Sequence, residues 1–319
     1  MRIAFLMDPL ERVSVQTDTS FALMLAAQAH GHGLYHLGPR DLLATTGGLR
    51  ARVRPARVSR EAPPAHCVLG AVETVDLAAM DVVFIRTDPP FDALYLYDTL
   101  LLEALRGGTL VVNDPRGLRD ANEKLYALHF GELTPRTVVT CREADVLDFL
   151  RELGGPAVIK PLDGAGGRGV LVLEPGDRNL RSIIETLTDD GRRYAVVQEF
   201  LPAVRKGDKR ILLLDGEPLG AILRVPREGE LRSNLHVGGT AVAAELDDDD
   251  RRILAGLGPR LRADGLYFVG IDVIGGRLTE VNVTSPTGIQ ELSRFTGVDH
   301  AAAVIAWAEA RAARLQGRP

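Results

Sequence analysis

Hydrophobic and polar positions in the first third of the chain follow two patterns. Short continuous apolar runs, typical of buried strands, are separated by longer stretches in which apolar residues recur at helical spacing. The predicted order is strand 2–7, helix 17–31, strand 82–86, helix 93–106 and strand 109–114. The helix 17–31 has an N-cap at Asp18 or Thr17 and a stop at Gly31. Alternating strands and helices predict an open α/β sheet, whose strand ends usually form the binding site.

From residue 113 onward the pattern changes to two compact α+β units. The first contains helix 115–130, strand 134–141, helix 142–153, strands 156–161 and 169–174, helix 178–190 and strand 194–202. The second contains a hairpin at 209–225 around Asp215-Gly216, a helix at 249–263, a hairpin at 267–283 turning at Gly275-Gly276, and a long C-terminal helix. We therefore predict α/β and α+β architecture with domains at 1–121, 122–201 and 202–319.

Composition and charge narrow the function classes. A net charge of -5 argues against a nucleic-acid partner, and no apolar run approaches the ~18 residues that a membrane-spanning helix needs. The arginine-rich stretch 49–60 alternates valine with arginine, which favours an exposed strand or hairpin over a site for an anion. Cys67 and Cys141 lack the spacing of a metal site or a disulfide framework. We expect a cytoplasmic protein with neither a nucleic-acid nor a membrane partner.

Lysine is scarce in this chain and clustered. Only four of the 38 basic residues are lysine, and they all lie between positions 124 and 209. Lysine supplies a compact ammonium charge that the planar guanidinium of arginine does not imitate. The four positions, Lys124, Lys160, Lys206 and Lys209, are therefore candidates for roles that need a compact charge, with clustering by chance as the alternative.

A glycine-rich loop follows Lys160. It contains Gly164, Gly166, Gly167 and Gly169, and its first, second and fourth glycines match G-x-G-x-x-G. A dinucleotide fingerprint must open a helix, whereas this loop leads into a strand, so that interpretation fails. The alternative is a loop between two antiparallel strands whose free N–H groups bind phosphate, with Lys160 directed at the same anion.

Acidic and amide side chains on the last predicted hairpin suggest a metal site. Glu280 and Asn282 lie two residues apart on one strand, so their side chains share a face. Oxygen ligands of this kind suit a hard divalent cation. Asp272 joins them if the hairpin loop has three residues (Gly275 to Arg277), whereas a two-residue loop puts it on the opposite face. The sequence does not decide between these two loop lengths.

Taken together, these segments resemble the ATP-grasp superfamily, and within it the prokaryotic glutathione synthetases. The resemblance runs nearly end to end. It is carried by DPPFD at 88–92, LRDANEKL at 118–125, LTPRT at 133–137, IKPLDGAGGRGV at 159–170, QEFLP at 198–202, KGDKRILLLDGEP at 206–218 and GLYFVGIDVIGGRLTEVNVTSPTGIQE at 265–291. It implies a substrate-binding domain at 1–121, an ATP-grasp lid domain at 122–201 and a catalytic domain at 202–319.

The resemblance also implies an ATP site and a metal site. Phosphates would be held by Lys124, Lys160 and the glycine loop, and Mg²⁺ (or Mn²⁺) by Asp272, Glu280 and Asn282. Gln198, Glu199, Phe200 and Leu201 would contact adenine, and Asp208 the ribose.

The implied reaction joins γ-glutamylcysteine to glycine through an acyl phosphate, at the expense of ATP. Arg210 and Arg224 would neutralise the two anions that meet in the first step. Arg86 would anchor the peptide carboxylate, a polar loop at 225–239 would act as a lid with Arg232 reaching the substrate, and Ser285, Pro286, Thr287 and Gly288 would hold the glycine end. Thr17 departs from related sequences, which often have a basic residue there.

Two alternatives remain. One is another ATP-grasp carboxylate–amine ligase, such as a D-alanine ligase or a glutamate-adding enzyme, although DPPFD and VNVTSPTG weigh against it. The other is a non-catalytic nucleotide-binding module of the kind that synapsin represents, although Arg210, Arg224, Glu280 and Asn282 argue for catalysis. The resemblance further implies a homo-oligomer, most simply a tetramer.

Overall fold

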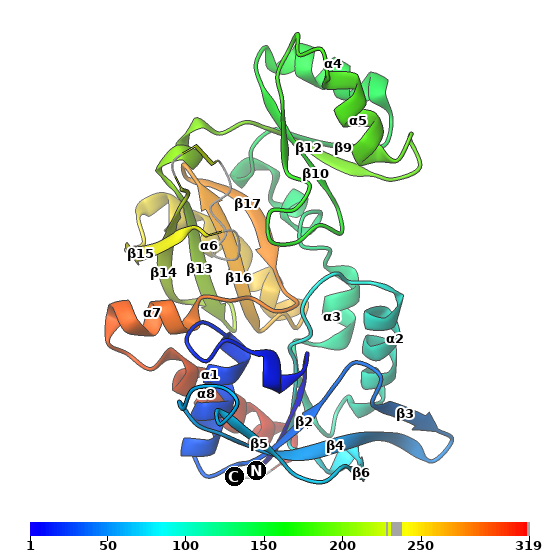
Figure 1. Ribbon diagram of the computed structural model, residues 1–319, viewed down its shortest axis with the longest axis vertical. Helices are drawn as coiled ribbons and strands as arrows, with labels where there is room; N and C mark the ends of the chain where they lie inside the picture. The colour runs from blue at the N-terminus through cyan, green and yellow to red at the C-terminus, as the bar shows by residue number, and fades with distance from the viewer. Residues whose placement is uncertain (228, 231–237, 318–319) are drawn as a thin grey trace.

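A computed structural model describes residues 1–227, 229–230 and 238–317 of the chain. Three sheets are stacked along the long axis of the molecule, and each has its own helices (Figure 1). The sheet nearest the two chain ends comes from the first third of the sequence, the small sheet at the opposite end from residues 137–199, and the middle sheet from residues 208–282. Within the described residues, no helix combines the length and the apolar character that crossing a membrane requires.

The N-terminal sheet is built around four parallel strands in the order β2-β1-β7-β8. Its strands are β1 (Arg2–Leu6), β2 (Gly33–Leu37), β3 (Leu42–Thr45), β4 (Gly48–Val58), β5 (Cys67–Leu69), β6 (Glu73–Asp76), β7 (Val82–Ile85) and β8 (Leu110–Val112). Side chains along β4 alternate between buried and exposed for most of its length, which confirms a strand at this position, with one face buried and the other exposed.

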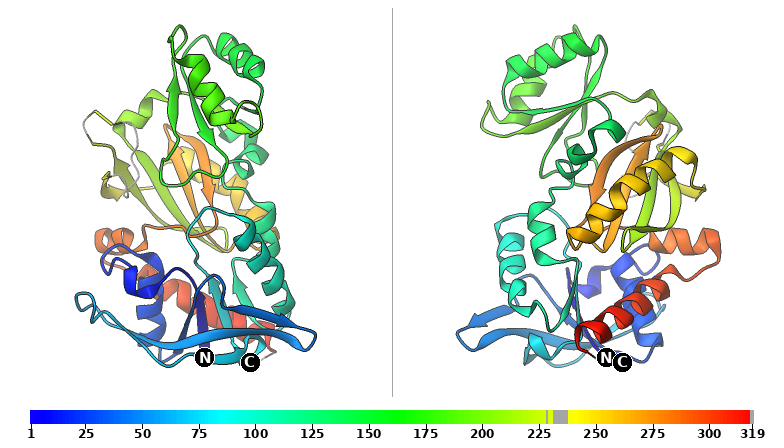
Figure 2. Two further views of the ribbon diagram at one scale, coloured as in Figure 1. Left: turned by 45° about the vertical axis from the view of Figure 1, so that its right-hand side comes forward. Right: turned by 180° about the vertical axis from the view of Figure 1, so that it is seen from behind.

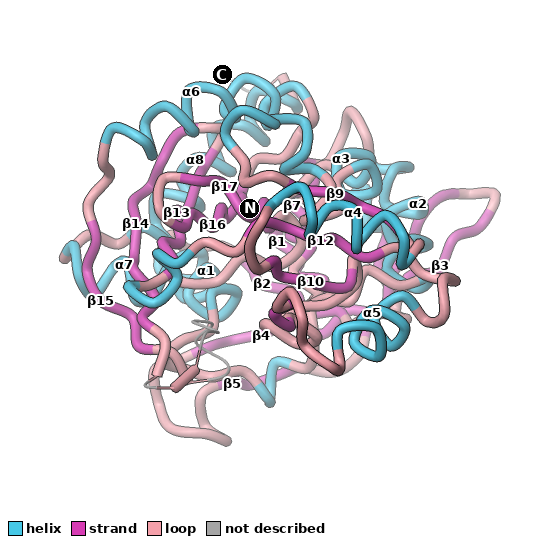
Figure 3. Tube along the Cα trace, turned by 90° about the horizontal axis from the view of Figure 1, so that it is seen from above, coloured by secondary structure: helices cyan, strands magenta, loops and turns pink. Residues whose placement is uncertain are grey.

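Helices flank this sheet. Helix α1 (Thr19–Ala29) is capped by Asp18, whose Oδ1 accepts a hydrogen bond from the amide of Phe21 at 2.7 Å, as the sequence predicts. Helices α2 (Ala93–Leu102) and α3 (Pro115–Asp120) lie on the other side of the molecule from α1 (Figures 1 and 3). Helix α2 is shorter than predicted, because a 3₁₀ turn at Glu103–Leu105 follows it.

The predicted continuous helix 115–130 is wrong. Helix α3 ends at Asp120, and a 3₁₀ helix begins only at Tyr126. Between them the Asn122 side-chain oxygen accepts hydrogen bonds from the amides of Lys124 and Leu125, both at 3.1 Å. An asparagine side chain that binds nearby amides offers the backbone an alternative to the helix. The interruption directs residues 122–124 toward the other two sheets.

The small sheet is antiparallel throughout, in the order β11-β10-β12-β9. Its elements are β9 (Thr137–Thr140), α4 (Glu143–Leu153), β10 (Ala157–Pro161), β11 (Leu171–Leu173), α5 (Leu180–Thr188) and β12 (Ala195–Glu199). Its buried apolar residues, among them Val146, Ile159 and Ile184, form a cluster separate from the rest of the core. This unit therefore has its own core and lies apart from the N-terminal sheet (Figure 2).

The middle sheet has the order β15-β14-β13-β16-β17. Its strands are β13 (Asp208–Leu214), β14 (Glu217–Val225), β15 (Thr240–Ala244), β16 (Phe268–Ile274) and β17 (Arg277–Asn282), and helix α6 (Asp248–Ala263) packs on it. The acidic run at the start of α6 forms a capping box between Asp247 and Asp250. Strand β15 is not predicted, because its small residues are mostly exposed and carry little hydrophobic pattern.

The predicted long C-terminal helix is two helices, α7 (Ile289–Thr296) and α8 (His300–Leu315), separated at Gly297, whose φ of 70° is left-handed. Helix α8 packs against α1, and β1 begins and α8 ends at the same end of the molecule (Figure 1). Val304 and Ile305 join Phe21 in one core cluster. The last helix thus covers the first sheet, although the predicted domain 202–319 includes it, and the domain boundaries stay predictions.

Asn113 joins the first and middle sheets. Its side-chain nitrogen donates hydrogen bonds to the carbonyls of Phe268 (2.9 Å) and Val283 (2.7 Å). Its side-chain oxygen accepts hydrogen bonds from the amides of Tyr267 and Phe268, both at 2.7 Å. A buried amide with both ends satisfied fixes the register of the elements it touches. The N-terminal strands are therefore held against the end of the hairpin that carries Glu280 and Asn282.

Candidate active site

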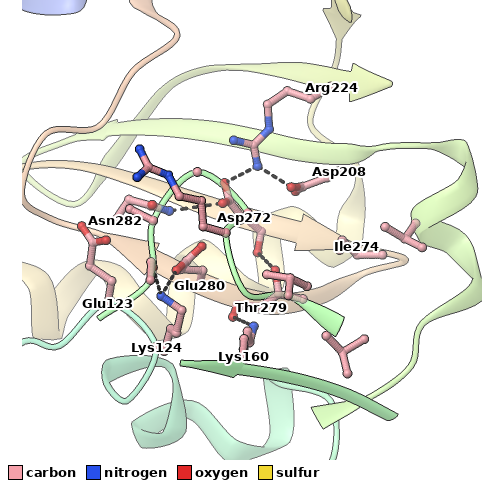
Figure 4. Close-up of a pocket in the computed structure, with 18 of the residues that line it drawn as sticks. Glu123, Lys124, Lys160, Asp208, Arg224, Asp272, Ile274, Thr279, Glu280 and Asn282 are labelled. Atoms are coloured by element: carbon pink, nitrogen blue, oxygen red, sulfur yellow. Dashed lines mark hydrogen bonds and ion pairs between the residues drawn. The ribbon is translucent and has the colours of Figure 1, made fainter. Parts of the chain in front are cut away.

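A cavity of about 670 Å³ lies between the small sheet and the middle sheet. The cavity brings together most of the residues that the sequence predicts for the site. They are Lys124, Lys160, Gly164, Gly166, Gly167, Gln198, Glu199, Phe200, Leu201, Asp208, Arg210, Arg224, Asp272, Glu280, Asn282, Ser285 and Thr287. Figure 4 shows the charged side chains converging from the two sheets and from residues 123–124.

The glycine loop joins two antiparallel strands, β10 and β11, as the sequence predicts. Gly166, Gly167 and Gly169 have left-handed φ angles of 63°, 77° and 71°, a conformation that glycine adopts at little cost. Gly169 does not line the cavity. A Cβ atom there would lie 3.0 Å from the ring of Pro161, so its contribution is to the path of the loop.

Two buried lysines lie below this loop. The Nζ of Lys124 donates to the carbonyl of Gly164 at 2.5 Å and pairs with Oε1 of Glu280 at 3.1 Å. The Nζ of Lys160 donates to the side-chain oxygen of Gln198 at 3.2 Å and to the carbonyl of Thr279 at 3.4 Å. Burial lowers the pKa of Lys160, while the nearby charge of Glu280 opposes that change. Both ammonium groups thus face the space that the glycine loop covers.

Lys209 is bound to acidic residues outside the cavity. Lys209 pairs with Asp247 at 2.7 Å and with Asp250, at the start of α6. Neither Lys206 nor Lys209 lines the cavity. Of the four lysines, Lys124 and Lys160 therefore line the cavity, and these are the two for which the resemblance implies phosphate binding.

Asp272 is held by two arginines. Arg210 binds both of its oxygens, with Nε–Oδ1 at 2.6 Å and Nη2–Oδ2 at 3.0 Å, and Arg224 reaches Oδ1 at 2.9 Å. Burial alone would raise the pKa of Asp272, but the two arginines hold it well below its ordinary value. Arg224 also binds Asp208, whose pKa burial raises to about 6 against the opposing effect of Arg224. The two guanidinium groups are therefore fixed in place by carboxylates.

The register of the β16–β17 hairpin decides between the two loop lengths that the sequence allows. The loop has two residues, because Ile274 pairs with Arg277. The pairing then shifts, so that Asp272 still lies opposite Glu280. The extra residue is Thr279, whose hydroxyl donates to the carbonyl of Asp272 at 3.1 Å. A β-bulge, not a longer turn, brings Asp272 onto the face of Glu280.

The three predicted metal ligands are close together. Nδ2 of Asn282 donates to Oδ2 of Asp272 at 3.3 Å. Glu280 lies on the same face, opposite Asp272 and two residues before Asn282. All three line the cavity, and Figure 4 shows them directed into it. Two carboxylates and one amide oxygen form the hard donor set that a divalent cation such as Mg²⁺ prefers. The residues present therefore fit such an ion.

Glu123 is a residue of this site that the sequence interpretation missed. Its Oε1 accepts hydrogen bonds from the amides of Val283 (2.9 Å) and Thr284 (3.2 Å) and from the hydroxyl of Thr284 (2.9 Å). Its own carbonyl accepts from the amide of Val281 at 3.0 Å. Burial raises the pKa of Glu123, and the charge of Glu280 raises it further. The motif LRDANEKL contains this glutamate, but the predicted continuous helix concealed that it faces the site.

Arg86 is buried behind the cavity and does not line it. Its Nε donates to the hydroxyl of Ser20 and its Nη2 to the carbonyl of Pro286, both at 2.9 Å. It thus holds the segment 284–288 in place from the N-terminal sheet. Instead of Arg86, Asp88 and Pro89 are the residues of that domain that line the cavity.

Within the segment 284–288 the four predicted residues divide into two groups. Ser285 and Thr287 line the cavity, whereas Pro286 and Gly288 do not. Gly288 has a left-handed φ of 115° and is the N-cap residue that precedes helix α7. Arg232 lies outside the described residues, although Gly229 and Glu230, from the same predicted lid, line the cavity.

Comparisons with known proteins agree with this architecture. The pattern of the family described as prokaryotic glutathione synthetase, N-terminal domain, matches residues 1–119, and that of its ATP-grasp domain matches residues 123–297. A glutathione synthetase of Thermosynechococcus vestitus is 46% identical over 316 residues, which are 96% of this chain and 99% of that protein. One of Mesorhizobium japonicum is 47% identical over 299 residues, 94% and 95% of the two chains.

A solved structure extends the comparison to the fold. The D-alanine–D-alanine ligase of Bacillus anthracis, complexed with ATP, superposes with a TM-score of 0.62 at 17% identity and covers 99% of both chains. At that identity the likeness concerns the fold alone. The family patterns and the near full-length relatives go further, and by them this chain, with its ATP-grasp fold, belongs to the prokaryotic glutathione synthetase family.

Proposed function

We propose that this protein ligates γ-glutamylcysteine to glycine at the expense of ATP, forming glutathione, ADP and phosphate. The observation that carries the proposal is the single cavity in which two buried lysines and a glycine loop face an arginine–carboxylate cluster. Near full-length relatives named glutathione synthetase support the choice of substrates.

ATP would lie between the two sheets that form the cavity. Lys124, Lys160 and the amides of the glycine loop would bind its phosphates, because fixed positive charge and free N–H groups are what phosphate oxygens require. Glu199, Phe200 and Leu201 would contact the adenine and Asp208 the ribose. Gln198 accepts from Lys160 and donates to the hydroxyl of Thr137 at 3.0 Å, so we assign it the role of positioning Lys160.

The metal site would consist of Asp272, Glu280 and Asn282. A bound Mg²⁺ or Mn²⁺ would neutralise negative charge on the phosphate oxygens. Glu280 also pairs with Lys124, so the same carboxylate would set the position of a phosphate-binding lysine. Asp272 in turn orients Arg210 and Arg224.

The chemistry brings two anions together. The cysteinyl carboxylate attacks the γ-phosphorus of ATP, ADP leaves, and an acyl phosphate forms. The glycine amine then attacks the acyl carbon and loses a proton, and phosphate leaves. Arg210 and Arg224 would stabilise the charge that develops, and because carboxylates already hold them they need little reorganisation. Removing one preorganised donor of this kind typically costs about 3 to 4 kcal/mol in the barrier.

The peptide and glycine would occupy the end of the cavity near Asp88, Ser285 and Thr287. Arg86 would be a positioning residue: by binding the carbonyl of Pro286 it would hold the segment 284–288, which also contains Gly288, against the substrates. Arg232, in the loop 225–239, would reach the substrate once that loop covers the site, which protects an acyl phosphate from water. We further propose that the enzyme acts in the cytoplasm as a homotetramer.

The test is phosphate release from ATP and Mg²⁺, with γ-glutamylcysteine and glycine added separately and together. D-Alanine and glutamate serve as alternative substrates, and mass spectrometry identifies the product. We expect release that needs both substrates, with an equal amount of glutathione. Turnover only with another acid or amine would replace the substrates, and ATP binding without turnover in any combination would refute the ligase function.

A further inference from the structure

Two histidines and a glutamate form a cluster far from the active-site cavity. His30 and His32 flank the turn between α1 and β2, and Glu309 projects from α8 (Figure 1 shows these three elements at the end of the molecule that carries both termini). One ligand atom from each residue lies within 4.8 Å of the others. None of the three lines the active-site cavity.

The backbone fixes both histidines. Helix α1 closes with a Schellman motif, in which the amide of His32 donates to the carbonyl of Ala27 at 3.1 Å and that of Gly31 to Gln28 at 3.0 Å. Gly31 has the left-handed φ, 78°, that this motif requires. Because His30 and His32 lie on either side of that glycine, both rings meet Glu309 on the packed helix α8. The cluster is therefore built on rigid elements.

The distances suit a small metal ion. Oε1 of Glu309 lies 3.0 Å from Nδ1 of His30 and 2.5 Å from Nε2 of His32. Ligand bonds of about 2.0–2.1 Å in a tetrahedral site put neighbouring ligand atoms roughly 3.3 Å apart. Widening these two distances to that value requires movements of less than about 1 Å, and the two histidine nitrogens lie within 4.8 Å of each other. His32 is the most buried of the three, and His30 and Glu309 are about one-third exposed, which leaves the ion a path from solvent.

The donor set selects the class of ion. Two imidazole nitrogens and one carboxylate suit Zn²⁺, Ni²⁺ or Cu²⁺, whereas Mg²⁺ and Ca²⁺ prefer oxygen ligands. The carboxyl-terminal end of α1 adds the negative end of a helix dipole beside the site.

We propose that His30, His32 and Glu309 form a structural site for one borderline divalent transition-metal ion, of which Zn²⁺ is the representative. The ion would connect the end of α1 to α8, and so tie the last helix of the chain to the first sheet. The inference is independent of the ligase activity, since it rests on residues outside that site.

The test is calorimetric titration of the full chain with Zn²⁺ in excess Mg²⁺, which occupies the oxygen-ligand site. The variants are His32→Ala and Glu309→Gln, with the exposed His129→Ala as the matched control. We expect one tight site in the wild type and in the control. Affinity should fall by more than about 100-fold in the two ligand variants, because even outer partners of metal ligands account for 10- to 100-fold.

Thermal unfolding supplies a second readout. Zn²⁺ at about 100 times its dissociation constant should raise the midpoint of the wild type and of His129→Ala by roughly 5 °C, with no rise in His32→Ala or Glu309→Gln. Circular dichroism checks that the variants are folded. The absence of tight Zn²⁺ binding by the wild type, or equal binding by the wild type and both ligand variants, would overturn the proposal.

Discussion

Glu123 offers the sharpest test of how the site is held together. In Glu123→Ala, the amides of Val283 and Thr284 and the hydroxyl of Thr284 lose their shared acceptor. Val283 and Thr284 are buried, and each buried donor left without a partner costs about 1–3 kcal/mol. Allowing for partial relaxation, we expect the free energy of unfolding to fall by about 3–5 kcal/mol.

Glu123→Gln separates the hydrogen bonds from the charge. Glutamine keeps a side-chain oxygen that accepts from the same donors, so we expect the free energy of unfolding to stay within about 1 kcal/mol of the wild type. The pKa of Glu123 is raised in the folded state by burial and then by Glu280. Its contribution to stability is therefore complete below the unfolded pKa and is lost as pH rises through the folded pKa. The stability of Glu123→Gln relative to the wild type should accordingly increase with pH.

Urea unfolding at several pH values, together with steady-state kinetics, measures both effects. We expect Glu123→Ala to lower kcat by at least about tenfold, because residues 283–284 connect Asn282 to Ser285 in the site, and a shift of 1.4 kcal/mol in the barrier gives that factor. Glu132→Ala, an exposed glutamate nearby, is the control and should change stability by less than about 0.5 kcal/mol. An alanine variant as stable as the control, or a glutamine variant as unstable as the alanine variant, would refute the reasoning.

Three further predictions concern the metal site, the glycine loop and a buried acid. Glu280→Gln should lower turnover by more than about 100-fold in the phosphate-release assay and leave the fold intact by circular dichroism; near-normal activity would remove its assignment as a ligand. Gly169→Ala places a Cβ 3.0 Å from Pro161 at a left-handed φ, and a residue with a Cβ costs about 1–2 kcal/mol in that conformation. If the loop loses that much of its ATP-binding free energy, the KM for ATP should rise roughly tenfold, and an unchanged KM would contradict this. Burial and then Asp92 raise the pKa of Asp98 to about 6. The protonated Asp98 therefore stabilises the folded state at low pH, and the wild type loses this stabilisation as pH rises from about 4 to 6. Asp98→Asn should gain about 1–3 kcal/mol relative to the wild type between pH 4 and 7 in urea unfolding, and a constant difference would disprove the shift.

Features that depend on neighbouring residues were predictable from the sequence. The N-cap at Asp18, the hairpin at Asp215-Gly216 and the exposed strand 49–60 all form where expected. Their signals are local, because caps, tight turns and strand alternation involve residues a few positions apart. The glycine loop and Lys160 were identifiable for the same reason, since strand, lysine and loop follow one another directly.

Other features were decided by contacts between residues far apart in the chain. Asn122 interrupts the predicted helix, and its side-chain nitrogen binds the carbonyl of Leu162 at 3.2 Å, forty residues later. Arg86 was expected at the substrate, yet it holds Pro286, two hundred residues away. A polar side chain takes the best partner that the folded chain brings within reach, and the local sequence does not contain that partner.

The sequence by itself, through its motifs and its family resemblance, identified the side chains that we propose for the chemistry: Lys124 and Lys160, the glycine loop, the two arginines and the three oxygen-bearing residues of the hairpin. Tertiary structure decided how they face one another. The bulge at Thr279 sets Asp272 opposite Glu280, the interruption at residues 121–125 turns Glu123 and Lys124 toward the hairpin, and α8 returns to pack on α1. The physical reason is that side-chain identity and spacing are properties of the chain, whereas register, burial and partner choice depend on which distant segments pack together.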